Sequence, residues 1–443
     1  MLKKVIFLVW VLFPMYTLTA QGDQKGPIQL TLNAEASYQL LESNQDLRKI
    51  EKLLELRQTG VLDNNGLNIG TQLIAITDYQ KSTVNSKFGY LMRHPTAANQ
   101  VGTAVSEAVI HSAQVSLTGS INPWLSTHIE LLYNPEQSFG SGTITSLERN
   151  QIQIRRGFAV FGDLNRFPLY GAIGKMDTPF GQTGSVSPFT NSSMWHAFGG
   201  LAYGMQVGYK KNGLSLALML IQGGAQFRAA NTPVGDNTNV PSKLNNFSVD
   251  LNYRFGVSEV VRLQIGGSYL YGSPYCQDFP VFHFNPCSEN NPAYSLYGNI
   301  QLGNRLYIQG SYAQTIDVWK GTHNPTPPLD IFEASKASSL DVGGRYDLFK
   351  TAQMAYSLSA EFSNFRAGPD GSPWERQNQW ILGFSGLYKK SSKFFVELFH
   401  TQGFVPLNFI SGSADNAPFP PGTTHSTQEA NSIGIVAGVQ LTL

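Results

Sequence analysis

The last thirteen residues constrain the fold most strongly, because apolar side chains recur at every second position up to the carboxyl end. The apolar positions are Ile433, Ile435, Ala437, Val439, Leu441 and Leu443, and most positions between them are small or polar. Successive side chains of a β-strand point to opposite faces. A strand of this kind at the end of a chain is typical of the strand that closes a membrane-spanning barrel.

Similar stretches recur back to Leu67, each near the nine to eleven residues that a tilted membrane strand needs. They lie at residues 67–79, 109–121, 125–134, 151–161, 169–176, 201–210, 214–223, 247–255, 261–271, 294–302, 306–316, 340–348, 354–365, 379–389, 393–401 and 431–443. The sequence therefore predicts an all-β fold, a transmembrane antiparallel up-and-down β-barrel of about sixteen strands over residues 67–443.

The connections between these strands alternate between short and long. The short ones lie at residues 122–124, 163–167, 211–213, 256–259, 303–304, 349–352 and 390–392. The long ones lie at residues 80–108, 135–150, 177–200, 224–246, 272–293, 317–339, 366–378 and 402–430. In outer-membrane barrels the short turns face the periplasm and the long loops face outside.

The beginning of the chain predicts export. Residues 1–20 combine Lys3-Lys4, an apolar run and a small residue at Ala20, as a signal peptide does. An exported chain with amphipathic strands and no later long apolar run is expected in the outer membrane of a Gram-negative bacterium, embedded in lipid. The net charge of +1 gives no reason to expect a nucleic-acid partner. Cys276 and Cys287 share one loop, and we expect a disulfide, with metal or redox roles as alternatives.

Residues 21–66 carry a short heptad pattern. Leu40, Leu47, Leu54 and Val61 recur every seven residues, with charged residues beside them. Three heptads are marginal for an isolated helix. We expect a periplasmic helical or coiled-coil segment that assembles a homotrimer or touches the cell wall. The alternative is a helix that lies on the barrel or a frayed linker.

Side-chain parity assigns the charged residues of the strands to a polar lumen, because lipid cannot bond polar groups whereas water can. The pore-lining candidates are His128, Glu130, Lys175, Lys210, Asp250, Arg254, Arg262, Asp341, Arg345, Asp347, Glu361 and Glu397. Charged rings select ions in pores, and the alternative is that these residues pair across strands and stabilise the wall. An anion-selective porin would show a ladder of arginine and lysine residues, and the sequence shows no clear ladder of this kind. Arg155 and Arg156 are adjacent, so a regular strand would send one into lipid, and a bulge at Gly157 would relieve this.

The long connection at residues 177–200 is a candidate constriction loop. Folded inward, it would narrow the channel with polar and aromatic side chains such as Asn191, Trp195 and His196; folded outward, it would be an ordinary surface loop. Five histidines, His94, His196, His283, His323 and His425, fall in predicted outer loops without ligand spacing. We therefore expect no metal site and no cofactor. No catalytic motif is present, so we do not expect an enzyme.

Residues 151–181 resemble the LbtU-type siderophore porins. In that group a Phe-Gly turn leads to Phe-Pro-Leu-Tyr, a Gly-Lys or Gly-Arg pair and Pro-Phe-Gly, which stand here at residues 161–162, 167–170, 174–175 and 179–181. The hairpin at residues 112–133 and the heptad segment look similar to that group, and the phosphate-selective porin O/P group is a more distant likeness. The resemblance implies plug-less uptake of a ferric siderophore across the outer membrane. Arg155-Arg156 depart from the acidic residue that related chains tend to carry.

Two functional hypotheses follow. The first is a porin that passes small hydrophilic solutes, with a ferric siderophore as one candidate, without energy or a plug. A barrel of about sixteen strands leaves an aqueous channel, whereas plugged receptors have about 22 strands. The second is a barrel that anchors long surface loops for adhesion or structural contact. It predicts a lumen filled by side chains or by the N-terminal segment.

Overall fold

The structure is a computed structural model that describes residues 29–45, 47–85, 87, 102–133, 152–222, 243–275, 290–318, 332–405 and 427–443. Three helices lie in these residues: α2 (Ala34–Leu41), α3 (Lys49–Gln58) and α4 (Ser193–Phe198). The strands are β1 (Gln29–Thr31), β2 (Gly66–Ser82), β3 (Ala104–Asn122), β4 (Leu125–Tyr133), β5 (Ile152–Phe161), β6 (Leu169–Asp177), β7 (Leu201–Lys211), β8 (Leu214–Gln222), β9 (Leu244–Gly256), β10 (Val261–Leu270), β11 (Ala293–Leu302), β12 (Leu306–Thr315), β13 (Ser338–Lys350), β14 (Met354–Arg366), β15 (Arg376–Tyr388), β16 (Ser392–Phe404) and β17 (Thr427–Thr442).

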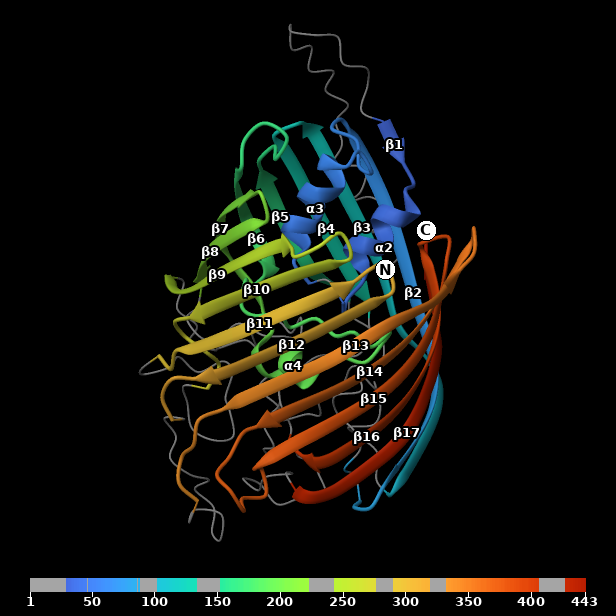
Figure 1. Cartoon of the computed structure of the whole chain (residues 1–443), viewed down its shortest axis with the longest axis vertical. Coiled ribbons are helices and arrows are strands. Elements are labelled where there is room, and N and C mark those ends of the chain that lie inside the picture. Colours follow the sequence, from blue (N-terminus) through green and yellow to red (C-terminus); the bar gives the residue numbers. More distant parts are fainter. Residues whose placement is uncertain are drawn as a thin grey trace, which may run out of the picture.

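Strands β2 to β17 form a closed antiparallel barrel (Figure 1). Each strand pairs with its neighbours in the chain, and β17 pairs with β2 from Ser432–Ser82 to Thr442–Gln72. The predicted sixteen-stranded barrel is therefore confirmed, with strand ends shifted by a few residues. The prediction missed β1, which pairs in parallel with the first residues of β2.

The outer surface of the barrel is apolar. In β8, Leu216 and Leu218 point outward and are about two-fifths exposed, whereas Ser215 and Ala217 between them are buried. A lipid-facing wall must be apolar, and a closed barrel leaves no strand edge whose backbone groups would lie unpaired in hydrocarbon. The protein is therefore an outer-membrane barrel. Among the described residues, no helix is long and apolar enough to cross a membrane.

The N-terminal segment, residues 29–62, lies mainly inside the barrel. Figure 1 shows α2 and α3, in blue, enclosed by the strands. The heptad residues Leu40, Leu47 and Leu54 are buried there, and Ser37 lies against Gly70 of the barrel wall. The predicted periplasmic coiled coil is wrong for these residues. The wall supplies the apolar partner that short helices need, and residues 42–48 interrupt the helix.

The two adjacent arginines both point inward because a β-bulge lies at Arg155, two residues before the predicted Gly157. Glu130 of β4 pairs with Arg156, whereas the next residue, Leu131, pairs with Ile154, so Arg155 is the extra residue. Glu130 accepts hydrogen bonds from Arg155 at 3.3 Å and from Arg156 at 2.7 Å. Asp177 bonds Arg156 through two oxygens at 2.7 and 2.8 Å. Two carboxylates thus neutralise two buried guanidinium groups.

We predict that Glu130→Ala destabilises the barrel by about 3 to 5 kcal/mol, because it leaves buried guanidinium charge uncompensated. The measurement is the free energy of unfolding in detergent or lipid by urea titration. Asp370→Ala is the control, since Asp370 pairs with Arg366 at an exposed position and surface pairs contribute little. Equal effects of the two variants would contradict the structural role of Glu130.

Candidate functional site

The connection after β6, residues 178–200, folds into the lumen and is held there by two carboxylates of the opposite wall. Glu361 of β14 accepts hydrogen bonds from the Val186 amide at 2.6 Å and from the Ser185 hydroxyl at 2.6 Å. Glu397 of β16 accepts from the Phe189 amide at 2.6 Å and from the amide and hydroxyl of Thr190. Hydrogen bonds to charged acceptors are the stronger kind. We call this connection the inner loop.

The second half of the inner loop carries the three constriction candidates. The Asn191 carbonyl accepts from Gln379 at 3.0 Å. Trp195 and His196 lie in α4, where Trp195 borders a cavity and His196 is buried with its ring edge-on to Trp195. The loop thus lies inside the lumen, and of these three side chains Trp195 borders the remaining space.

An apolar layer closes the lumen beside the inner loop. The rings of Phe180 and Phe198 lie 5.9 Å apart, Phe198 and Tyr275 lie 5.4 Å apart, and Tyr275 and Phe365 lie 6.0 Å apart. Phe189 stacks on Phe395 at 4.9 Å. These rings are buried, so the described part of the lumen contains a packed core where a wide pore would contain water.

The inner loop and the N-terminal segment hold each other. The Ser185 amide donates to the Asn44 carbonyl at 2.7 Å, and the Asn44 side chain donates to the Ser187 carbonyl at 2.6 Å. A Cβ at Gly184 would lie 2.1 Å from the Gln45 carbonyl oxygen. Such a close approach of two backbones requires glycine. The two segments therefore form one internal plug.

Arg48 anchors the N-terminal segment to the wall. Its guanidinium bonds Asp250 at 2.5 and 2.9 Å and donates to the Tyr297 hydroxyl at 2.8 Å and to the Gly181 carbonyl at 3.1 Å. Burial alone would lower the pKa of Arg48, but Asp250, Tyr297 and Glu51 together outweigh burial and raise the pKa. A bidentate pair of this kind fixes orientation as well as charge.

Two lysines of the wall hold the segment on other sides of the lumen through three further ion pairs. Lys210 of β7 contacts Glu55 at 2.7 Å and Glu51 at 3.2 Å. Lys393 of β16 lies 3.8 Å from Glu42. Burial alone would raise the pKa of Glu42, but Lys393, Lys49 and two backbone amides together lower it.

Two cavities remain beside the plug. The first, of about 440 Å³, lies between the inner loop, the N-terminal segment and strands β9 to β13. The second, of about 410 Å³, is lined by α3, the turn at Asn212 and the ends of β7 and β9. Arg48, Glu51, Arg254 and Gln264 line both cavities. The Arg48 side chain therefore stands at the junction between them.

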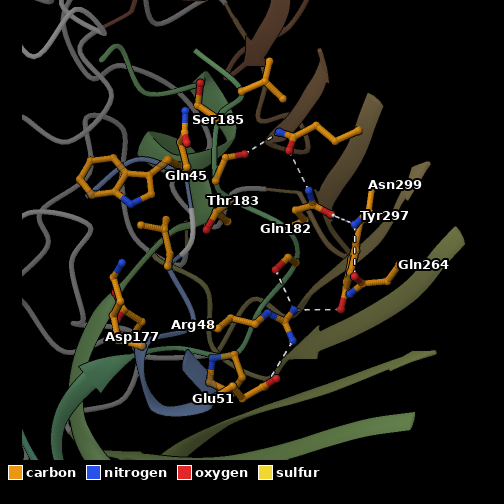
Figure 2. Close-up of a pocket in the computed structure, with 18 of the residues that line it drawn as sticks. Gln45, Arg48, Glu51, Asp177, Gln182, Thr183, Ser185, Gln264, Tyr297 and Asn299 are labelled. Atoms are coloured by element: carbon orange, nitrogen blue, oxygen red, sulfur yellow. Dashed lines mark hydrogen bonds and ion pairs between the residues drawn. The ribbon is translucent and has the colours of Figure 1, made fainter. Parts of the chain in front are cut away.

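The wall of the first cavity consists of polar rows that run across neighbouring strands. Gln264 faces Asn299, and Asn299 faces Gln309 in the register of β10, β11 and β12. Gln182 of the inner loop bonds Gln309 at 2.8 Å and Asn299 at 3.3 Å. Figure 2 shows Arg48 reaching toward Tyr297, with Gln182 and Asn299 meeting farther along the wall. The cavity thus offers amides and guanidinium groups to a solute.

Eleven of the twelve pore-lining candidates lie on the inner side of the barrel, in five settings, and Lys210 belongs to two of these. Glu361 and Glu397 bind the inner loop, and Asp250 and Lys210 bind the N-terminal segment. His128, Glu130 and Asp341 are buried in the wall, where His128 bonds Thr118 at 2.9 Å and Asp341 accepts from Gln309 at 2.9 Å. The candidates that border a cavity are Arg254, Arg262, Arg345 and Lys210. Asp347 lies near the rim, 3.8 Å from Arg345.

Lys175 is a correction. It pairs in register with Tyr203, an outward side chain that is 58% exposed, and its ammonium lies 5.6 Å from that ring. Tyr170, Ala172 and Met176 of the same strand are buried, so Lys175 occupies the outward parity. Gly174, with a φ of +137°, lies directly before it. A lysine near the end of a strand can extend its ammonium to the membrane surface.

Sequence reasoning missed Arg48, Gln182 and Tyr297. Arg48 was missed because its segment was assigned to the periplasm. Tyr297 and Asn299 alternate with Leu296 and Ile300, and this parity in β11 was the available signal. Residues 1–20, Cys276, Cys287, His94, His283, His323 and His425 lie outside the described residues. Among the residues that the structure describes, no group of three His, Cys, Asp or Glu side chains could hold a metal ion.

Comparisons with known proteins support the fold. No protein-family model matches the sequence. A UPF0422 protein of Coxiella burnetii (strain RSA 493 / Nine Mile phase I) is 26% identical over 153 residues, which is 34% of this chain and 29% of that relative. The match thus spans less than a third of the relative.

Solved porin structures are similar over most of the chain. Salmonella typhi OmpF in complex with daunomycin is 11% identical, with a TM-score of 0.51 over 85% of this chain and 97% of that chain. Pseudomonas putida OprB is 10% identical, with a TM-score of 0.49 over 87% and 96%. The Acinetobacter baumannii channel DcaP is 11% identical, with a TM-score of 0.48 over 85% and 98%. The likeness to OmpF gives the class: an outer-membrane β-barrel of the porin fold.

We predict that Glu361→Ala loosens the inner loop without unfolding the barrel. The amides of Val186 and Ser187 lose their acceptor, so they exchange hydrogen faster with deuterium, as locally opened segments do. The measurement is hydrogen exchange by mass spectrometry on peptides of residues 183–192. Asp347→Ala is the control, because Asp347 does not contact this loop. Unchanged exchange in Glu361→Ala would contradict the anchoring role.

We predict a pH-dependent contribution from Glu42. Its pKa is lower in the folded protein than the ordinary value of 4.5, so its stabilisation is present above about pH 4.5 and is lost as the pH falls through the lowered pKa. Glu42→Gln should cost about 1 to 3 kcal/mol at neutral pH, and the difference from the native protein should shrink as the pH falls below 4.5 through the lowered pKa. The measurement is the free energy of unfolding across this range. Glu35→Gln, at an exposed pair with Lys390, is the control.

Proposed function

We propose that this protein is an outer-membrane channel for small hydrophilic solutes, and that its lumen is closed in the described conformation by the internal plug. The observation that carries the proposal is the pair of polar cavities beside the plug, which share Arg48, Glu51, Arg254 and Gln264. The lumen-facing amides and arginines around them suit a hydrated solute. The passage of solutes without a plug, as expected from the sequence, stays a prediction, and the internal plug bears against it.

A local movement at Arg48 is the route that we propose between the cavities. Arg48 lines both cavities. Its side chain is 25% exposed, whereas the side chain of its partner Asp250 is 1% exposed. Displacing this side chain breaks its pair with the buried Asp250, at about 3 to 5 kcal/mol, whereas expelling the segment costs on the order of 10 kcal/mol. The channel would therefore open without loss of α2 and α3 from the lumen.

A ferric siderophore is the finer candidate solute. Its support is the resemblance of residues 151–181 to the LbtU-type siderophore porins. Growth on the ferric siderophore as sole iron source, with and without the protein, tests this point separately from conductance. The homotrimer stays a prediction, and the heptad no longer supports it because its leucines are buried in the lumen.

The second candidate function is a barrel that anchors surface loops for adhesion or structural contact. The filled lumen favours it, because this hypothesis predicts occlusion by the N-terminal segment. In that case the plug would be a permanent core, and the loops between the strands would carry the function.

Conductance in planar bilayers separates the two functions. We expect discrete conductance steps from the native protein, and steps severalfold larger from Arg48→Ala, because the guanidinium no longer stands between the cavities. Lys390→Gln is the matched control, since it removes a cation that pairs with the same segment at the exposed rim. Absence of conductance in both the native protein and Arg48→Ala would overturn the channel and favour the anchor.

A further inference from the structure

We propose that the first cavity holds a binding site for small oxyanions, carboxylates or phosphates, formed by Arg254, Arg262 and Arg345. This inference rests on the proposed function, because it names the class of solute that the cavity takes. The three arginines come from β9, β10 and β13 and line the same cavity. Sequence parity placed them in the lumen but showed no ladder, because they are far apart in the chain.

The strand register brings the three guanidinium groups onto one part of the wall. Gln264 pairs with Arg254 and lies two residues from Arg262, so Arg254 and Arg262 are diagonal neighbours, with Cα atoms about 7 to 8 Å apart. Arg262 pairs with Gln301, Gln301 with Tyr307, and Tyr307 with Arg345. Three strand spacings separate Arg262 from Arg345, about 14 Å. Arg254, Arg262, Gln301, Tyr307 and Arg345 thus form a row across the wall that is cationic at both ends and polar between them.

The charge of this row is not balanced by the protein. Among the described residues, Arg254 donates to the neutral Gln264 oxygen at 3.1 Å, and neither Arg254 nor Arg262 forms an ion pair. Arg345 donates to the Gln45 oxygen at 3.2 Å and lies 3.8 Å from the half-exposed Asp347. Elsewhere in this lumen the half-buried Arg48 and the buried Arg156 each have a carboxylate within 2.7 Å.

The carboxylates that line the cavity do not compensate the charge of this row either. Asp177 forms a two-oxygen pair with Arg156, and Glu51 bonds Lys210 at 3.2 Å. Two like charges on neighbouring strands repel each other. Arg254 and Arg262 are exposed to the solvent of the cavity, which screens part of this repulsion. A bound anion would remove the rest.

The chemistry of the row suits an oxyanion. A guanidinium presents paired N–H donors that match the two oxygens of a carboxylate or phosphate. Gln301 and Tyr307 lie between the cationic ends and add hydrogen-bond donors. Arg345 lies 5.9 Å from the Tyr307 ring, which orients its guanidinium plane. A solute with two acidic groups would reach both ends of the row.

The test is direct binding to the purified full-length mature protein in detergent, by isothermal titration with inorganic phosphate and separately with succinate. We expect saturable binding of one or both anions that weakens with salt, and at least tenfold weaker binding to the double variant Arg254→Gln, Arg262→Gln. Arg376→Gln is the matched control, because Arg376 lies at the other end of the barrel beside Glu375. It should bind as the native protein does.

The outcomes separate the site from the channel. No binding to the native protein, or equal binding to the double variant, overturns the site even if the protein conducts. Binding without conductance supports the site and overturns the channel. The midpoint of thermal unfolding checks that the variants fold. If the double variant does not fold, the single variant Arg262→Gln replaces it. Weaker binding to that variant is then expected, and unchanged binding would overturn the site.

Discussion

The closed ring of backbone hydrogen bonds is the constraint on which the rest of this structure depends. In hydrocarbon every N–H and C=O group must be paired, and sixteen antiparallel strands meet this demand only if β17 returns to β2. Closure sends one side of every strand into lipid and the other into a lumen. The charged side chains that hold the plug are therefore gathered in one enclosed space.

Filling that space changes what the charges do. Once the inner loop and the N-terminal segment occupy the lumen, water leaves, and buried charges need partners. Glu130, Glu361 and Glu397 meet this demand by binding guanidinium groups or loop amides. Arg254 and Arg262 need no such partner, because they border the cavity and are exposed to its solvent. The contrast between paired and unbalanced charges thus separates the plug contacts from the candidate site.

The sequence predicted the wall well and the plug poorly, for a physical reason. Strand alternation is local, so residues such as Leu216 and Ser215 reveal their faces without knowledge of any partner. The bulge at Arg155 depends on Glu130 of the neighbouring strand. The outward parity of Lys175, in contrast, follows from the exposed Leu169 and Ile173 of the same strand, so the sequence carried this signal. The position of Arg48 depends on Asp250, which lies 202 residues away. No local pattern carries such information, and the same heptad of leucines suits a coiled coil or the inside of a barrel.

The energetics of the plug limit how a channel of this kind opens. Expelling α2 and α3 would expose Leu40, Leu41, Leu53 and Leu54, which are almost fully buried. At about 1.5 to 3 kcal/mol for each side chain, this costs on the order of 10 kcal/mol before any ion pair is broken. Since each 1.4 kcal/mol is a factor of ten, such a state would be populated about one part in 10⁷. Local opening is therefore the less costly route, and Arg48, which lines both cavities, is the side chain at which we propose it.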